Sequence, residues 1–169
     1  TDLSNYYNSL GIYYQRQYNI DSAKHYYKKA IETALEKENK SQTHADIALF
    51  YQNLAIPYAM RQDYEIAKQY FFKSISILNQ NQQKAKNDLA RNYINIGRLY
   101  LLIGSVDSAT YYYNKAQKIR ENLDNISSAN LAIIYNNLGE LHTTKSNMAK
   151  ARMHFQKAKQ LYEKSGTKY

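Results

Sequence analysis

One short phrase returns four times along the chain at a nearly constant interval, and this repetition constrains the fold more than any other feature. The copies are YNSLGIYY from residue 7, YQNLAIPY from 51, YINIGRLY from 93 and YNNLGELH from 135. The fifth residue of each copy is small, and successive small residues lie 44, 42 and 42 positions apart. A repeat of this length is one supersecondary unit that buries its apolar face only by stacking on its neighbours. The chain is therefore four copies of one structural repeat.

A second pattern begins twelve residues after each small residue. An alanine there is followed after four residues by an aromatic side chain, and after three more by another small residue. Steps of four and three place side chains on one face of a helix, so each repeat is expected to hold two helices that pack through such stripes. The stripes of the second helices are Ala23, Tyr27, Ala30; Ala67, Phe71, Ser74; Ala109, Tyr113, Ala116; and Ala151, Phe155, Ala158.

The two halves of each repeat are separated by a residue of the kind that begins helices. These residues stand four positions before the second-half alanine, and they are Asn19, Asp63, Ser105 and Asn147. Their side-chain oxygens accept hydrogen bonds from the unpaired N–H groups of a first helical turn. Each repeat is therefore predicted to be a helix, a tight turn and a second helix.

The combined pattern resembles the tetratricopeptide repeat, with Tyr where that family often has Trp. The segment QDYEIA at residues 62–67 resembles the family's turn between helices. The period exceeds the family's usual length of about 34 residues and is similar to the longer repeats of kinesin light chains and of some bacterial peptide-pheromone receptors. The resemblance implies an all-α fold, a right-handed α-solenoid of four helix-turn-helix repeats with eight antiparallel helices.

The repeats also set the expected domain organisation. A single solenoid is predicted over residues 1–164, with repeats at about 1–42, 43–86, 87–127 and 128–164, and residues 165–169 as a tail or the start of a linker. In the fourth repeat, His154 and Lys159 stand where the second repeat has Tyr70 and Ile75. A more polar outer face of this kind is typical of a terminal repeat.

The asparagines of the phrase are not explained by packing. Asn53, Asn95 and Asn137 stand two residues before the small residue, where the first copy has Ser9, on the face opposite the packing stripe. An amide side chain donates and accepts hydrogen bonds, so a row of asparagines can pair with the backbone of an extended peptide. The resemblance supports this hypothesis, because long-repeat relatives hold peptides with asparagines at this place. The alternative is that these amides bond to neighbouring helices and fix the register of the repeats.

Other side chains on the same face would complete a concave groove. Arg91 and Arg98 lie one turn on either side of Asn95 and are candidates to hold a carboxylate, with a solvated pair as the alternative. Ile56, Met60 and Leu102 are expected to supply apolar contacts, and Glu140 and Thr144 share the face of Asn137.

Composition narrows the remaining function classes. Twenty-three Lys and Arg against fourteen Asp and Glu give a net charge of +9, but these residues are dispersed, which favours a solvated outer face over a nucleic-acid interface. The chain has no Cys, and no apolar run approaches the length of a membrane span. The four His residues have no metal-ligand spacing and no phosphate-binding loop is present, so neither catalysis nor a metal or cofactor is expected. His142 occupies a tyrosine position and is predicted to be a packing residue.

The sequence therefore predicts a non-enzymatic module that binds a protein or an extended peptide. The resemblance places such modules in larger bacterial proteins of signal transduction or transcriptional regulation, as sensing or scaffolding segments. Self-association through uncapped ends, giving a homo-oligomer, is the main alternative, and nucleic-acid binding is a lesser one. The compartment stays open between cytoplasm and periplasm, with the cytoplasm favoured.

Overall fold

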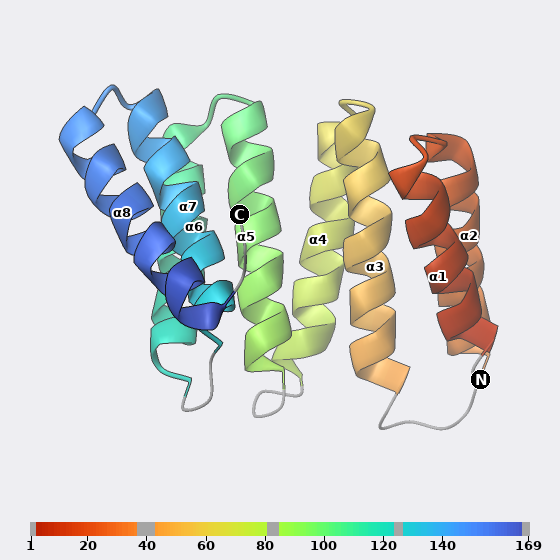
Figure 1. Ribbon diagram of the computed structural model, residues 1–169. Coiled ribbons are helices and arrows are strands. Elements are labelled where there is room, and N and C mark those ends of the chain that lie inside the picture. Colours follow the sequence, from red (N-terminus) through yellow and green to blue (C-terminus); the bar gives the residue numbers. More distant parts are fainter. Residues whose placement is uncertain (1–2, 37–42, 81–84, 124–126, 167–169) are drawn as a thin grey trace. The chain divides into compact units, whose positions relative to one another are not determined.

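The computed structural model describes residues 3–36, 43–80, 85–123 and 127–166. These ranges hold eight α-helices and no strand, so the predicted all-α architecture of paired helices is confirmed (Figure 1). The helices are α1 (Leu3–Arg16), α2 (Ile20–Leu35), α3 (Thr43–Met60), α4 (Tyr64–Asn79), α5 (Lys86–Leu102), α6 (Val106–Glu121), α7 (Ser128–Thr144) and α8 (Met148–Ser165).

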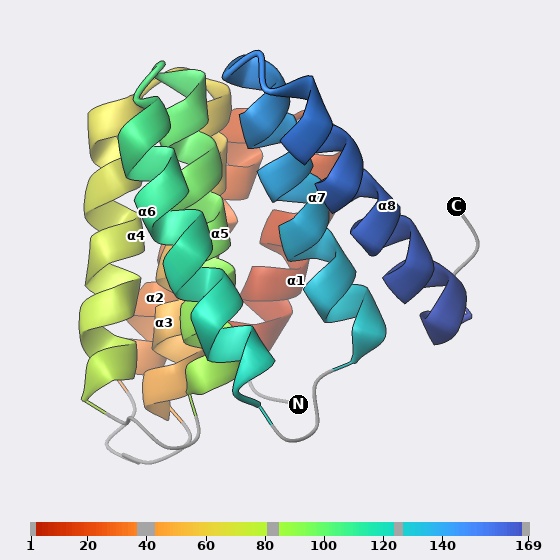
Figure 2. The same cartoon turned by 90° about the vertical axis from the view of Figure 1, so that its left-hand side faces the viewer.

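The chain divides into two compact units, which are described separately. The N-terminal unit is Thr1–Asp88 and contains α1 to α4, and the C-terminal unit is Leu89–Tyr169 and contains nearly all of α5 together with α6, α7 and α8. Each unit therefore holds two repeats. Figure 2 shows α7 and α8 side by side in the C-terminal unit. Among the described helices, none is both long enough and apolar enough to cross a bilayer.

The small residue of the phrase makes room for an aromatic ring of the partner helix. A Cβ atom added to Gly97 of α5 would lie 2.5 Å from the ring of Tyr113 in α6. The same contact, at 2.5 and 2.6 Å, pairs Gly11 with Tyr27 and Gly139 with Phe155. Protein interiors are close-packed, so a larger residue would displace the ring. Three of the four helix pairs make this close approach at a glycine, and the second repeat has the next smallest residue, Ala55, at the same position.

A second recurring contact joins the last residue of the phrase to the second helix. Tyr100 of α5 stacks on Tyr112 of α6, with ring centroids 5.5 Å apart and an interplanar angle of 4°. In the fourth repeat, His142 of α7 stacks on His154 of α8 at 5.1 Å and 2°. The earlier repeats place Tyr14 on Tyr26 and Tyr58 on Tyr70. The prediction that His142 packs in a tyrosine position is confirmed.

The turn within each repeat has one residue in the left-handed region. It stands seven positions after the small residue, with φ of 57° at Tyr18, 65° at Gln62, 77° at Gly104 and 55° at Ser146. This conformation is costly for residues with a Cβ atom, and only the third repeat relieves it with glycine. The backbone frame of the turn is therefore the same in all four repeats, although its sequence is not.

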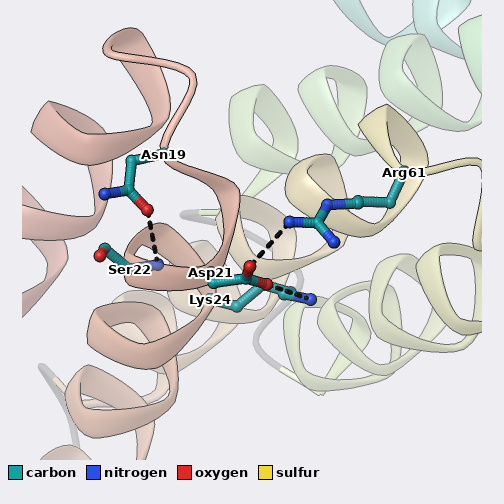
Figure 3. Close-up of polar contacts among 5 residues, drawn as sticks. All are labelled: Asn19, Asp21, Ser22, Lys24 and Arg61. Atoms are coloured by element: carbon teal, nitrogen blue, oxygen red, sulfur yellow. Dashed lines mark hydrogen bonds and ion pairs between the residues drawn. The ribbon is translucent and has the colours of Figure 1, made fainter.

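The residue after this turn position is the predicted N-cap. The helices α2, α4, α6 and α8 begin immediately after Asn19, Asp63, Ser105 and Asn147, which confirms the predicted helix starts. The side chain of Asn19 accepts a hydrogen bond from the backbone N–H of Ser22 at 3.2 Å (Figure 3). Asn147 accepts one from Lys150 at 3.1 Å, whereas Asp63 and Ser105 make no side-chain capping bond.

An ion pair links the two repeats of each unit near these turns. Arg61, which follows α3, places Nη2 2.7 Å from Oδ2 of Asp21 in α2, and Lys24 approaches the same carboxylate at 3.1 Å (Figure 3). Hydrogen bonds from Lys24 and Arg61 hold the pKa of Asp21 below its usual range. In the C-terminal unit, Lys145 and Asp107 occupy the corresponding positions at 3.5 Å. These pairs are exposed to solvent, so they set orientation more than stability.

Within each unit, the first helix of the second repeat covers the second helix of the first. In the N-terminal unit, Ile47, Phe50 and Leu54 of α3 join Tyr27 and Ile31 of α2 in one buried cluster. In the C-terminal unit, α7 packs on α6 in the same way. The chain thus buries its apolar stripes by stacking successive helices, as a repeat protein does.

Candidate functional site

A pocket of about 400 Å³ lies inside the C-terminal unit, mainly between α5 and α7. Eleven residues line it: Arg91, Ile94, Asn95, Arg98, Arg120, Asn130, Ile133, Asn136, Asn137, Glu140 and Tyr162. Five of them, Arg91, Asn95, Arg98, Asn137 and Glu140, are among the candidates that the sequence singles out. Four of these five belong to the recurring phrase, Arg91 precedes its third copy by two residues, and the fold brings all five to one pocket.

Two of the four asparagines that line the pocket, Asn95 and Asn137, keep the hydrogen-bonding capacity of their side chains. Asn137 is 6% exposed and Asn95 is half-buried, so both amides are largely shielded from bulk water. No hydrogen bond joins either side chain to another residue in the described part of the unit. A shielded amide that faces a pocket has donors and an acceptor available to a ligand.

The pocket has an excess of positive charge. Arg91 and Arg98 reach it from α5 and are exposed, while Arg120 reaches it from α6 and is only 3% exposed. Nη1 of Arg120 donates a hydrogen bond of 2.7 Å to the backbone carbonyl of Asn130, which holds the guanidinium in place. The residues that line the pocket include three guanidinium groups and one carboxylate, that of Glu140, so their net charge is positive and suits an anionic group.

Glu140 is itself oriented by its own helix. Its Oε1 accepts a hydrogen bond of 2.9 Å from Nδ2 of Asn136 one turn earlier in α7. Thr144 donates its hydroxyl to the backbone carbonyl of Glu140 at 3.1 Å and does not line the pocket. Leu102, at the end of α5, is 63% exposed and also lies outside the lining.

The remaining candidates belong to the N-terminal unit. Nδ2 of Asn53 in α3 donates a hydrogen bond of 2.9 Å to Oδ1 of Asn8 in α1. This bond joins the first two repeats, as the register hypothesis requires of an asparagine at this position. Ile56 is half-buried and Met60 is 42% exposed.

The different behaviour of Asn53 and Asn137 follows from the residue at one position of the preceding repeat. The position of Asn8 in the first repeat is taken by Ile94 in the third. Asn53 finds an amide partner at that position, whereas the corresponding position for Asn137 is aliphatic. An isoleucine side chain cannot accept or donate, so Asn137 faces the pocket instead.

Sequence reasoning missed Arg120, which is the most buried charged residue of the pocket. The sequence did contain a signal for Arg120. It stands eleven residues after the second-half alanine, where the other repeats have the packing residues Ala34, Leu78 and Tyr162. A lone arginine at a position of the packing stripe is uncommon unless it is paired. Asn130 and Asn136 had no such signal, since both are ordinary residues of a helix surface.

Family models for the tetratricopeptide repeat match residues 3–40, 90–123 and 132–165, which together make up more than half of the sequence. The chain belongs to the tetratricopeptide-repeat family. Repeats of this family form protein-interaction modules, so the coarse prediction of an interaction module is confirmed. Curated proteins include no significant match to the sequence. Over the described residues, no group of three or more His, Asp or Glu side chains could hold a metal ion.

Solved structures with the same fold include BtubC (BKLC) from P. vanneervenii, with a TM-score of 0.79 and 23% identity over 99% of this chain. The apo form of RapI gives a TM-score of 0.80 with 18% identity over 96% of the chain. The Rap conjugation gene regulator of the plasmid pLS20, in complex with the Phr* peptide, gives 0.77 with 19% identity over 93% of the chain. The alignment with this tetratricopeptide-repeat chain covers 66%, 57% and 42% of the lengths of those three solved chains.

Proposed function

We propose that the chain binds an extended peptide in the pocket of the C-terminal unit. The proposal rests on Asn95 and Asn137, which line the same pocket. Both side chains are shielded from solvent, and neither has a hydrogen-bond partner among the described residues. Each amide can donate to a peptide carbonyl and accept from a peptide N–H, as a neighbouring strand would. Such contacts read the peptide backbone and leave its side chains free to vary.

The arginines give the pocket a preference for one chemical group. Arg91, Arg98 and Arg120 can form charge-assisted hydrogen bonds with a carboxylate, either an acidic side chain or a C-terminus. Ile94 and Ile133 provide an apolar wall beside them. The ligand that fits best is a peptide with an extended backbone and one carboxylate seated among the guanidinium groups.

The neighbours support this function without specifying the ligand. The pLS20 Rap regulator was solved with a bound peptide, and it shares its fold with this chain. We therefore infer a sensing or scaffolding role within a larger bacterial signalling or regulatory protein, in which this module supplies recognition and other segments supply the output. In this role the module itself performs no chemical reaction.

The test is affinity selection from a degenerate peptide pool, followed by titration of the tightest binder as the free acid and as the C-terminal amide. Replacing Arg98 with Gln should weaken binding of an acidic peptide by about 1.5–3 kcal/mol, the contribution of a hydrogen bond to a charged group. Arg16→Gln is the matched control, since Arg16 is an exposed arginine of α1. Two results would overturn the proposal: a selected peptide that lacks Asp and Glu and binds equally well as the free acid and as the C-terminal amide, or equal effects of the two variants.

A further inference from the structure

The pocket of the C-terminal unit has an apolar part as well as a charged one. Ile94 of α5 and Ile133 of α7 line it together with the arginines. Ile94 is 5% exposed, whereas Ile133 is 40% exposed and leaves much of its aliphatic side chain in water. Removing apolar surface from water is favourable, so a ligand that covers Ile133 gains affinity over one that leaves it exposed.

The apolar part lies directly beside the guanidinium groups. Arg91 stands three residues before Ile94 and Arg98 stands four residues after it, so these three side chains share one face of α5. Side chains at such steps on a helix have Cβ atoms about 5–6 Å apart. A ligand that contacts Ile94 and pairs with either arginine therefore presents its aliphatic group and its carboxylate at about this separation.

The N-terminal unit shows the effect of a polar residue at the position of Ile94. Asn8 stands there in the first repeat, and its Oδ1 accepts the hydrogen bond of 2.9 Å from Nδ2 of Asn53. Ile94 cannot accept such a bond, so the amide of Asn137 stays available at the pocket. Ile94 therefore contributes apolar surface and also leaves Asn137 to the peptide backbone.

The apolar part also lies beside the amide on α7. Ile133 stands four residues before Asn137, one turn away on the same face of the helix. The amide that holds the peptide backbone in the proposed function is thus next to exposed aliphatic surface. The pocket volume of about 400 Å³ is in the range that holds a small organic ligand, so the pocket has room for more than a carboxylate.

We propose that the pocket selects an extended peptide in which an aliphatic side chain stands two residues from the acidic one. This inference rests on the proposed function, since it describes the peptide that binds there. Side chains two residues apart in an extended chain point to the same side and are separated by about 6.5 Å, which matches the spacing along α5. Adjacent side chains point to opposite sides, so an aliphatic residue directly next to the acid cannot contact Ile94 while the carboxylate meets Arg91 or Arg98.

The experiment uses the full chain and a pool of short amidated peptides with a single Asp fixed at the centre. All other positions are randomised without Asp or Glu, and the bound peptides are sequenced. Ile, Leu and Val should be enriched at least about threefold at a position two residues from the Asp, relative to the positions directly next to it, because only the former can bury a side chain against the isoleucines.

Ile133→Ser should reduce this enrichment by at least about half, since it removes the exposed aliphatic surface of the pocket. Ile66→Ser is the matched control, because Ile66 of α4 is also 40% exposed and lies in the N-terminal unit, so the enrichment should persist. Ile94→Asn should weaken the tightest selected peptide at least about tenfold, since the new amide binds Asn137 as Asn8 binds Asn53. Ile133 is a surface residue, so its variant keeps the test valid if Ile94→Asn fails to fold.

Equal frequencies of aliphatic residues at the two spacings would overturn the proposal, and so would an enrichment that Ile133→Ser leaves intact or that Ile66→Ser removes equally. If Asp peptides without this preference still bind and Arg98→Gln weakens them, the proposed function stands and only the spacing rule fails. A pool with no binding that depends on Arg98 would overturn both.

Discussion

At the scale of single residues, two equivalent tyrosines have different surroundings. The hydroxyl of Tyr27 donates a hydrogen bond of 3.0 Å to Oε1 of Gln15. The position of Gln15 is Leu101 in the third repeat, and the buried hydroxyl of Tyr113 has no hydrogen-bond partner among the described residues. Burial raises the pKa of both phenols, so both hydroxyls stay protonated and need an acceptor. The first repeat supplies an acceptor for the tyrosine hydroxyl, and the third repeat supplies none among the described residues.

This difference predicts opposite effects of the same substitution. Tyr27→Phe should lower the free energy of unfolding by about 0.5–1.5 kcal/mol, since it removes a hydrogen bond. Tyr113→Phe should leave stability unchanged or raise it by about 1 kcal/mol, since it removes a buried hydroxyl without a partner. Urea unfolding of the two variants checks the prediction. Equal destabilisation in both variants would contradict it.

At the scale of helix pairs, the fourth repeat replaces a tyrosine stack with a histidine stack. His142 and His154 keep the parallel arrangement of Tyr100 and Tyr112, but an imidazole can gain a charge near neutral pH. Burial lowers the pKa of both histidines, and Lys150 lowers each of them further. The Nδ1 atoms of both rings are buried and have no hydrogen-bond partner within the described residues.

The lowered pKa values predict a loss of stability in acid. The unfolded chain, in which these histidines titrate near pH 6.5, binds protons that the folded pair resists. The neutral histidine pair therefore makes its full contribution to the free energy of unfolding above about pH 6.5. This contribution is lost as the pH falls through the lowered pKa values of the folded state. Thermal melting at pH 7.5 and about pH 5 should show a larger loss in the natural chain than in the variant with His142→Tyr and His154→Tyr.

The double variant is the internal control, because it keeps the aromatic stack and every other titratable group, including His25 and His44. Parallel loss of melting temperature in the two proteins would contradict the assignment of the pH dependence to this pair.

Contacts within one helix pair are also the ones that the sequence could predict. Asn19 and Asn147 could be predicted as N-caps, and Gly97 as a contact for a large ring, because each depends on spacing within one repeat. The bond from Asn53 to Asn8 and the burial of Arg120 could not be predicted in the same way. They depend on which side chains of different helices meet, and a one-dimensional period does not contain that information.

At the scale of the whole molecule, one repeat frame serves different purposes along the chain. The N-terminal unit uses an asparagine to join two repeats, and the C-terminal unit presents asparagines with arginines on a pocket. We assign ligand recognition to that pocket. The repeated frame supplies rigidity, and substitutions at a few equivalent positions supply function.

The role of the pocket asparagines is tested by comparing Asn137→Ala with Asn53→Ala. Each variant is titrated with the tightest free-acid peptide from the degenerate pool, and its melting temperature is recorded. The account predicts that Asn137→Ala weakens the peptide by about 1–3 kcal/mol while the chain stays folded, since the amide pairs with the ligand. It predicts that Asn53→Ala lowers the melting temperature and has the smaller effect on affinity. A fall in melting temperature for Asn137→Ala with unchanged affinity would contradict the account and assign that asparagine to repeat register.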